Sequence, residues 1–468
     1  MTTRVRWTRA LVFGGGAIAA AAALLGGGGA TPLAWIAAVV LVGAGVLAAF
    51  SPYDQPYPQP APPQGDYALH TIQFDDFGTL WDVTQAQQVL DDIDATWQTG
   101  NTFVVVFVHG WHHNADPADH NLRDFDAKLL RRLHAQLTTR ERCDLREKLT
   151  GTRRIRLVGL YLGWRGRSLP GALDYLSVWS RGAAARRVGD GDASEFVERL
   201  QRMYLRANAT ARGPVDGTNP FMGLVTLGHS FGGQVLLRAV ARPLEFELAE
   251  RTQRQSDVLR PPRLKADILE RAAIDDFGDV NILLNPALEA GQFARIDDLR
   301  RQLRYPATQP PQLVVFSADD DFAREALFPA SRLATLPLRP PLRSPYQGRL
   351  YGQALGVLDA QRTHDMETTD GPPSLVDADY LVDGGSKVRE FDFSGDVRFG
   401  RVRMHGPPAL GDATPNSPVS VVVTHQALIR GHNGIFGDDF VEFLCAYMGF
   451  VSGKRLMIHH ERRNGPPA

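Results

Sequence analysis

Ser230 lies in a segment that changes character abruptly, from Phe221 to Val240. An apolar, strand-like run ends in the five residues GHSFG, Gly228 to Gly232, and a helix-like pattern follows. A serine on so sharp a turn has its hydroxyl pushed above the sheet, and the flanking glycines relieve the crowded backbone. The pattern predicts that Ser230 is a nucleophile and that the Phe231 N–H, at the start of the helix, stabilises an oxyanion. A Gly-rich turn with an incidental serine is the alternative for these five residues alone.

A histidine-rich loop follows another strand-like run. Residues 102–108, TFVVVFV, have the character of a central strand buried on both faces, and the loop His109 to Ala115, HGWHHNA, comes next. Because working loops lie at the carboxyl ends of parallel strands, we expect the Trp111 N–H to be the second oxyanion donor, with Gly110 allowing close approach. Three histidines could hold a metal, but no carboxylate or cysteine nearby completes a zinc signature, and we expect neither metal nor organic cofactor.

Four residues beside these loops are candidates to line a substrate cleft. His109 and Gly110 belong to the histidine-rich loop, His229 precedes the nucleophile, and Trp164 follows the strand-like run 155–162. The alternatives are that His109 braces its own loop by hydrogen bonding and that Trp164 is a packed surface residue.

The general base is expected in the loop after the last strand. That strand is predicted at residues 419–423, VSVVV, and His432 follows in a Gly-rich turn that lets its ring reach over the sheet to Ser230. His425, immediately at the strand end, is the alternative and is more simply read as a structural histidine. The order of these elements along the chain places the base last.

The acid of the site is expected after the strand-like run 313–317. Three adjacent aspartates follow it, Asp319 to Asp321, and like charges this close cannot all serve one imidazole. One of them, Asp321 or Asp320, is therefore expected to orient His432. The others should face solvent or cap the next helix.

Composition limits the classes of protein to consider. The chain has 468 residues, of which 44% are hydrophobic, so it can bury a large core. A net charge of −1 gives no reason to expect nucleic-acid binding. The two cysteines, Cys143 and Cys445, allow one remote disulfide but indicate neither a disulfide framework nor a thiolate zinc site. Oligomeric state cannot be read from the sequence.

The first 50 residues do not have the pattern of a globular fold. After three arginines, an Ala/Gly-rich run at 10–30 and a second uncharged run at 33–50 predict one or two membrane spans; a secretory signal peptide is the alternative for the first run. Residues 51–65 are proline-rich and predict an extended spacer rather than packed structure. The absence of Lys and Arg from Ser51 to Leu122 favours an extracytoplasmic domain on the membrane.

Residues 66–460 are predicted to form one catalytic domain, and residues 461–468 a flexible tail. Alternating strand and helix patterns predict an α/β fold with a mostly parallel central sheet and helices on both faces. Insertions are expected near 165–215, 245–278 and 329–416; the last is rich in proline and glycine and fits an irregular cap better than sheet core.

The chain order of oxyanion loop, serine, aspartate and histidine resembles that of the α/β-hydrolases. Within them the chain is similar to a membrane-associated group that shares an H-G-W-x-H-N-A loop, here His109 to Ala115. Asp75 to Gly78, an Asp-Asp-x-Gly segment, and Gly431 to Asn433 carry the same resemblance. The acid of that group lies in a Ser-x-x-Asp-aromatic-Ala stretch; here Ser317 to Ala323 has one extra residue, so counting from either end gives Asp320 or Asp321.

These observations predict a membrane-anchored serine hydrolase that cleaves a small-molecule or lipid ester through an acyl-enzyme. Thioesterase, acyltransferase and peptidase chemistry would use the same residues. The alternative from another class is a catalytically silent fold that acts as a membrane-bound interaction module. Labelling by a fluorophosphonate would separate the two, because only an activated serine reacts.

Overall fold

The fold was taken from a computed structural model of the chain. It describes residues 43, 56–63, 65–169, 171–209, 218–256, 274, 277–306, 309–329, 344–369, 396–406 and 416–464. Apart from Gly43, the two predicted membrane segments lie outside the described residues. Of the predicted tail 461–468, residues 465–468 lie outside them as well, whereas residues 461–464 belong to the last helix and not to a flexible tail. No helix among the described residues is long and apolar enough to cross a membrane.

A ten-stranded sheet runs through the described part of the molecule, in the order β1-β3-β2-β4-β5-β6-β10-β7-β9-β8. Strands β1 to β7 and β10 are mutually parallel, and at one edge β9 pairs antiparallel with β7 and β8 pairs antiparallel with β9. The strands are β1 Tyr67–Gln73, β2 Asn101–Val108, β3 Ile155–Gly163, β4 Met222–His229, β5 Val280–Leu284, β6 Leu313–Ala318, β7 His364–Thr368, β8 Val397–Phe399, β9 Val402–His405 and β10 Val419–Thr424. The α/β class and the mostly parallel sheet are therefore confirmed.

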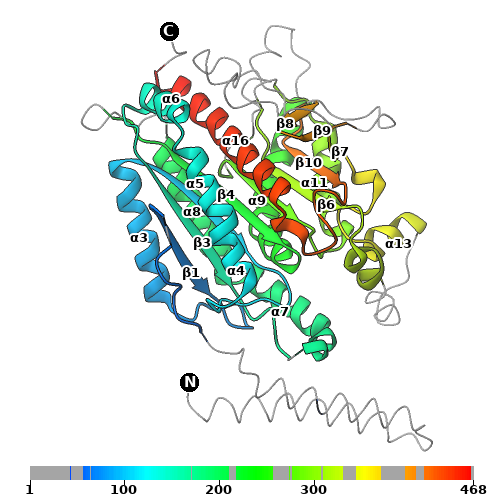
Figure 1. The fold of residues 1–468 in the computed structure, drawn as a ribbon. Coiled ribbons are helices and arrows are strands. Elements are labelled where there is room, and N and C mark those ends of the chain that lie inside the picture. The colour runs from blue at the N-terminus through cyan, green and yellow to red at the C-terminus, as the bar shows by residue number, and fades with distance from the viewer. Residues whose placement is uncertain are drawn as a thin grey trace, which may run out of the picture.

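Helices cover both faces of the sheet (Figure 1). Alternate residues of one strand enter different cores: Val104 and Val106 of β2 pack on one side, Phe103 and Val105 on the other. The first core includes helices α3, α7, α8, α9 and α11, and the second α4, α5, α6 and α16. The helices are α3 Val83–Thr99, α4 His120–Asp124, α5 Arg131–Leu137, α6 Arg140–Thr150, α7 Val178–Asp190, α8 Asp192–Asn208, α9 Phe231–Ser256, α11 Ala290–Gln302, α13 Pro345–Gly352 and α16 Asp438–Asn464.

Two segments differ from expectation. Part of the predicted irregular insertion 329–416 belongs to the sheet, because β7 pairs with β10 and carries β9 and β8 beyond it. Helices α7 and α8 likewise pack in the core instead of forming a separate insertion at 165–215; Leu200 and Tyr204 of α8 are fully buried.

The proline-rich segment is hydrogen-bonded to β1 where the structure describes it. The side-chain amide of Gln59 accepts from the Thr71 N–H (2.9 Å) and donates to the Thr71 carbonyl (2.9 Å). The amide of Gln73 makes the same pair of bonds with the backbone of Tyr57, both at 2.7 Å. An extended spacer was expected to lie free, but here residues 56–63 follow the outer edge of β1, because glutamine amides replace strand pairing.

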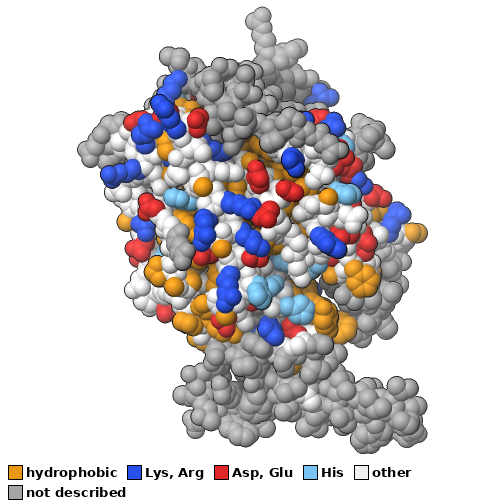
Figure 2. All heavy atoms as spheres, in the orientation of Figure 1, with side chains coloured by type: hydrophobic (Ala, Val, Ile, Leu, Met, Phe, Trp, Pro, Cys, Tyr) orange, Lys and Arg blue, Asp and Glu red, His pale blue; other side chains and the backbone are white. Residues whose placement is uncertain are grey.

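The surface charge and the state of the two cysteines can be compared with what the sequence indicated. Figure 2 shows Lys and Arg side chains interspersed with Asp and Glu on the face it presents. Cys143 and Cys445 are both free, so the remote disulfide left open by the sequence is not formed.

Candidate active site

Ser230 lies between β4 and α9 in a strained conformation. Its φ is +55°, a left-handed backbone value that residues other than glycine rarely adopt. The turn is held by the Ser230 N–H, which donates to the Leu284 carbonyl (3.0 Å), and by the Ser230 carbonyl, which accepts from the Gly233 N–H (3.0 Å). A Cβ at Gly228 would lie 2.7 Å from the Gly232 carbonyl oxygen, so the turn requires glycine there. The sharp turn predicted around the serine is present.

His432 joins Ser230 to Asp321. Its Nε2 lies 2.7 Å from Ser230 Oγ, and its Nδ1 lies 2.7 Å from Asp321 Oδ2. Burial alone would raise the pKa of Asp321, but the hydrogen bond and charge of His432 and the Arg324 guanidinium lower it to about 2. An ionised carboxylate at Nδ1 makes that nitrogen the donor and leaves Nε2 free to accept the serine proton.

The three adjacent aspartates have three different environments. Asp321 is fully buried, whereas Asp319 is exposed. Asp320 accepts a hydrogen bond from the Gly431 N–H (2.7 Å) through Oδ1 and so holds the loop before the histidine. Of the two candidate acids, the structure brings Asp321 to the imidazole. His425, the alternative base, caps the turn after β10, where its Nδ1 accepts from the Ala427 N–H (3.2 Å).

Two residues that sequence reasoning missed hold the acid and the base. Arg324, fully buried, donates from Nε to Asp321 (2.6 Å) and from Nη2 to the Ala318 carbonyl (2.7 Å). Asn285, at the end of β5, has a φ of +42° and donates from Nδ2 to the His432 carbonyl (2.9 Å). Its Oδ1 accepts from the Ala318 N–H (2.8 Å), so one side chain ties the end of β6 to the histidine loop. The sequence offered one signal for these two residues, which is their position: Asn285 follows the buried strand β5, and Arg324 follows the buried strand β6.

The two expected oxyanion donors lie beside the serine. Phe231 begins α9, where a first N–H has no partner within the helix, and neither it nor the Trp111 N–H donates to another backbone group in the described chain. A Cβ at Gly110 would lie 2.7 Å from Ser230 Cβ, so the loop after β2 packs directly on Ser230. The Trp111 indole N–H donates to Ser177 Oγ (3.1 Å), which fixes the residue.

The four residues expected to line the cleft are not among the residues that line it, so this prediction is wrong. His109 is buried: its Nδ1 donates to the Gly110 carbonyl (2.8 Å) and its Nε2 accepts from the Trp164 N–H (3.0 Å). Burial lowers the pKa of His109 to about 4, which keeps it neutral. Trp164 stacks on it with ring centroids 5.6 Å apart. His229 is also buried, burial lowers its pKa well below the ordinary value, and its Nε2 donates to the His432 carbonyl (2.9 Å).

The cleft itself opens beside Ser230 and His432 and has a volume of about 330 Å³. Three aromatic side chains at its rim are substantially exposed, Tyr175 at 58%, Trp179 at 52% and Phe322 at 67%. The other lining residues are Trp111, His112, Val178, Gly182, Arg186, Phe231, Gln234, Ala287, Ala323, Arg324, Phe328 and Asn433. Helix α7 thus supplies one wall, although the sequence predicted only an insertion in this region.

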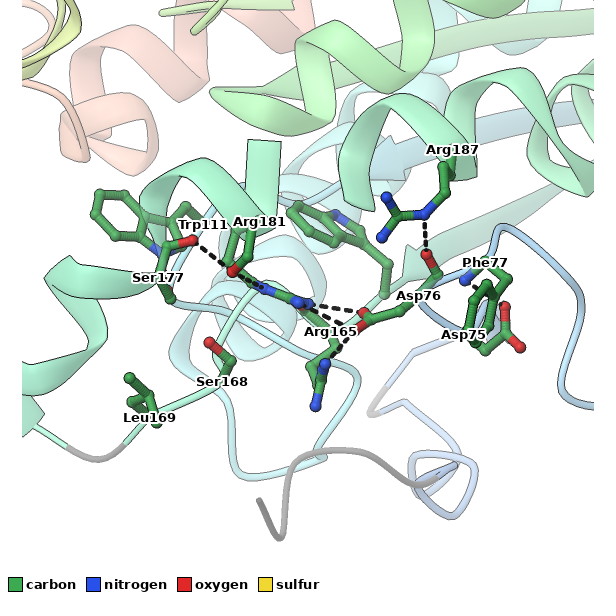
Figure 3. A network of polar contacts seen from close by, with 12 residues as sticks. Asp75, Asp76, Phe77, Trp111, Arg165, Ser168, Leu169, Ser177, Arg181 and Arg187 are labelled. Atoms are coloured by element: carbon green, nitrogen blue, oxygen red, sulfur yellow. Dashed lines mark hydrogen bonds and ion pairs between the residues drawn. The ribbon is translucent and has the colours of Figure 1, made fainter. Parts of the chain in front are cut away.

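A buried ion cluster holds that wall (Figure 3). Asp76, after β1, pairs with Arg181 of α7, whose Nη1 lies 2.7 Å from Oδ1, and with Arg165 of the loop after β3. Burial would raise the pKa of Asp76, but the two guanidinium groups lower it to about 2. Arg187 of α7 donates to the Asp76 carbonyl (2.7 Å). The Asp-Asp-x-Gly segment therefore positions α7 and not the reacting groups.

The site contains a serine that is hydrogen-bonded to an oriented imidazole, and two N–H groups beside a cleft. This arrangement is suited to nucleophilic attack on a carbonyl. The three histidines of the loop do not converge: His109 contacts Trp164, His112 contacts Asp174 and His113 contacts Asp119.

Comparisons with protein-family models, with curated proteins and with solved structures found no match to this chain.

Proposed function

We propose that this chain is a serine hydrolase with an α/β-hydrolase fold, held on a membrane by residues 1–50, that cleaves carboxylic esters. The observation that carries the proposal is the continuous pair of hydrogen bonds from Ser230 through His432 to Asp321, each 2.7 Å long. The three residues come from loops at the carboxyl ends of β4, β10 and β6, the edge where parallel α/β sheets place their working groups.

In the acylation step His432 Nε2 takes the Ser230 proton as Oγ attacks the ester carbonyl carbon. Asp321 fixes the imidazole tautomer and stabilises the imidazolium that forms. The N–H groups of Phe231 and Trp111 bind the carbonyl oxygen as it becomes negative; each such donor contributes about 10²- to 10³-fold to the rate. His432 then gives its proton to the leaving alcohol, and the acyl group stays on Ser230.

Deacylation repeats these roles with water. His432 takes a proton from a water molecule, whose oxygen attacks the acyl carbon, and returns it to Ser230 as the carboxylic acid leaves. The cleft of about 330 Å³ and its aromatic rim would hold a small-molecule or lipid ester. The uncharged runs in residues 1–50 support membrane attachment.

The test is hydrolysis of 4-nitrophenyl esters, from acetyl to long acyl, by the full chain in mild detergent. We expect turnover and fluorophosphonate labelling that both disappear in Ser230→Ala, because the proposed acyl-enzyme forms on the Ser230 hydroxyl. Ser417→Ala, before β10, is the matched control and should keep both signals. A folded wild-type protein with neither turnover nor labelling would instead favour the interaction module.

A further inference from the structure

Among the described residues, the cleft beside Ser230 is lined by one arginine that has no matching carboxylate. No aspartate or glutamate is among the described residues that line it, whereas Arg186 and Arg324 both are. Arg324 is neutralised by Asp321. Arg186 has no carboxylate within ion-pair distance in the described chain, so its positive charge is uncompensated at the wall of the cleft.

The packing of α7 on α9 places Arg186 near the nucleophile. A Cβ at Gly182 would lie 3.3 Å from the Phe231 ring, and a Cβ at Gly189 would lie 3.0 Å from Val235 Cα. The two helices are therefore in contact at both points, and Arg186, one turn beyond Gly182, lies between them on the same wall. A substrate bound at Ser230 would extend along this wall.

Gln234 adds a second unused donor to the same region. It follows Phe231 by one turn of α9, lines the cleft and is 2% exposed. Its Nε2 has no hydrogen-bond partner among the described residues. A buried amide N–H without an acceptor is costly, and a group of the substrate that accepts hydrogen bonds would relieve that cost.

His112 contributes a third polar group to the lining. Its Nδ1 lies 2.6 Å from Asp174 Oδ2. Asp174 is fixed, since its Oδ1 accepts from the N–H groups of Ser168 (3.0 Å) and Leu169 (2.9 Å). With Nδ1 held behind the wall, Nε2 is the ring nitrogen left for a ligand.

We propose that the substrate is an ester that carries a negatively charged group, such as a carboxylate, bound by Arg186 with Gln234 and His112 as further polar contacts. This inference rests on the proposed function, because the anionic group must belong to a molecule cleaved at Ser230. Arg186 is then the residue that selects charged over uncharged esters. A guanidinium pairs with a carboxylate through two parallel hydrogen bonds, which also sets the orientation of the substrate.

The experiment uses the full chain in mild detergent and two matched pairs of esters. Mono-4-nitrophenyl adipate and 4-nitrophenyl hexanoate differ by a charge on the acyl part, and 4-acetoxybenzoate and 4-acetoxybenzamide by a charge on the leaving part. We expect the charged member of at least one pair to have the higher kcat/KM. In Arg186→Gln the ratio of charged to uncharged kcat/KM should fall at least about tenfold, the effect of losing a charged hydrogen bond.

Two further variants make the result specific. Arg186→Lys should keep part of the ratio, because the charge remains while the paired geometry is lost. Arg154→Gln, an equal loss of charge at the opposite end of the sheet, should leave the ratio unchanged. No preference for charge in either pair, or an unchanged ratio in Arg186→Gln, would overturn the inference. If the folded wild-type protein shows neither turnover nor fluorophosphonate labelling, that different result overturns the proposed function itself.

Discussion

Asp319, Asp320 and Asp321 show how neighbouring residues of one type take different roles. Asp321 is buried against His432 and Arg324, Asp320 holds the backbone of Gly431, and Asp319 is exposed. The backbone turns sharply here, since the Arg324 and Glu325 N–H groups both bond the Asp321 carbonyl. Adjacent side chains therefore point in different directions, and only one reaches the imidazole.

Asparagine substitutions should separate the two candidate acids. We expect Asp321→Asn to lower kcat by about 10⁴-fold, because an amide no longer fixes the imidazole tautomer or stabilises its charge. Asp320→Asn weakens one hydrogen bond to the histidine loop and should cost about tenfold or less. Both values are measured by steady-state hydrolysis of a 4-nitrophenyl ester. A larger loss in Asp320→Asn than in Asp321→Asn would contradict the assignment of the acid.

The residues that meet at the candidate site could be predicted, but most of the residues around them could not. Ser230 and His432 follow strong strand patterns in a recognisable order, and their positions required only that parallel strands end at one edge. The lining of the cleft depends on which way a side chain turns. His109 and Trp164 stack on one another beneath the loop, and no spacing in the sequence indicates this.

The loop after β2 is fixed by what each of its residues touches. Gly110 packs on Ser230, and Ala115 lies against Gly163, where an added Cβ would be 2.5 Å from the alanine Cβ. Asn114 donates to the Tyr57 hydroxyl (3.2 Å). The H-G-W-x-H-N-A pattern is therefore explained by packing, because small residues allow the loop to lie between the nucleophile and β3.

Two glycines at opposite ends of β2 provide a matched test of this packing. Gly110→Ala places a Cβ 2.7 Å from Ser230 Cβ, and we expect kcat to fall on the order of a hundredfold as the nucleophile is displaced. Gly100→Ala meets nothing within 4 Å and should change kcat by less than about twofold. The measurement is kcat normalised to the fraction of enzyme labelled by a fluorophosphonate. Equal effects of the two substitutions would show that the loop does not constrain Ser230.

Long apolar elements were predictable and short polar ones were not. The parallel strands from β2 to β6 are nearly continuous apolar runs, the signature of strands buried on both faces. Strands β7 (HDMET) and β9 (VRMH) were missed. Both are half-exposed and lie among prolines and glycines, so their sequences lack the pattern of a buried strand. Residues 461–464 were expected to belong to a flexible tail, yet α16 continues to Asn464, and Lys454 and Arg455 are buried within it, contrary to the usual preference of charged residues.

The Asp76 cluster connects parts of the chain that are distant in sequence. One carboxylate joins the end of β1 to the loop after β3 and to α7. A pair of guanidinium groups buried without that carboxylate would be strongly unfavourable. The shape of the cleft wall is therefore coupled to the stability of the whole domain.

Acid should destabilise the protein through this cluster. The pKa of Asp76 is lowered to about 2 in the folded state, against about 3.9 when unfolded, so its contribution is complete above pH 4 and is lost as the pH falls towards 2. The shift corresponds to about 2 to 3 kcal/mol of unfolding free energy. We expect Asp76→Asn to unfold at lower urea than wild type at pH 7 and to lose less further stability at pH 3, as followed by tryptophan fluorescence.

A surface pair provides the control for this prediction. Asp190 contacts Arg238 at 2.7 Å but is 57% exposed, so Asp190→Asn should cost less than about 1 kcal/mol. If Asp76→Asn were no more destabilising than Asp190→Asn at pH 7, the buried cluster would not hold the domain together.

The order of the strands could not be obtained from the sequence. β1 lies beside β3 and not beside β2, and β10 lies between β6 and β7, because crossover helices carry the chain across both faces. Sequence patterns specify which segments are strands but not which strands are neighbours. The fold class was accessible for that reason, while the contact between α7 and the serine was not.

The prolines that run along β1 have a consequence for how copies of this protein behave towards one another. An edge strand with free N–H and carbonyl groups is a template on which another chain can add and start an aggregate. Here the Thr71 N–H and carbonyl of that edge are already bonded by the Gln59 side chain, the Gln73 side chain bonds the backbone of Tyr57, and prolines at alternate positions of residues 56–63 have no N–H to offer outward. The segment ends the sheet on this side and prevents its growth into an intermolecular one. A chain shortened to begin at Gly65 would lose this protection while keeping every residue of the proposed catalytic site.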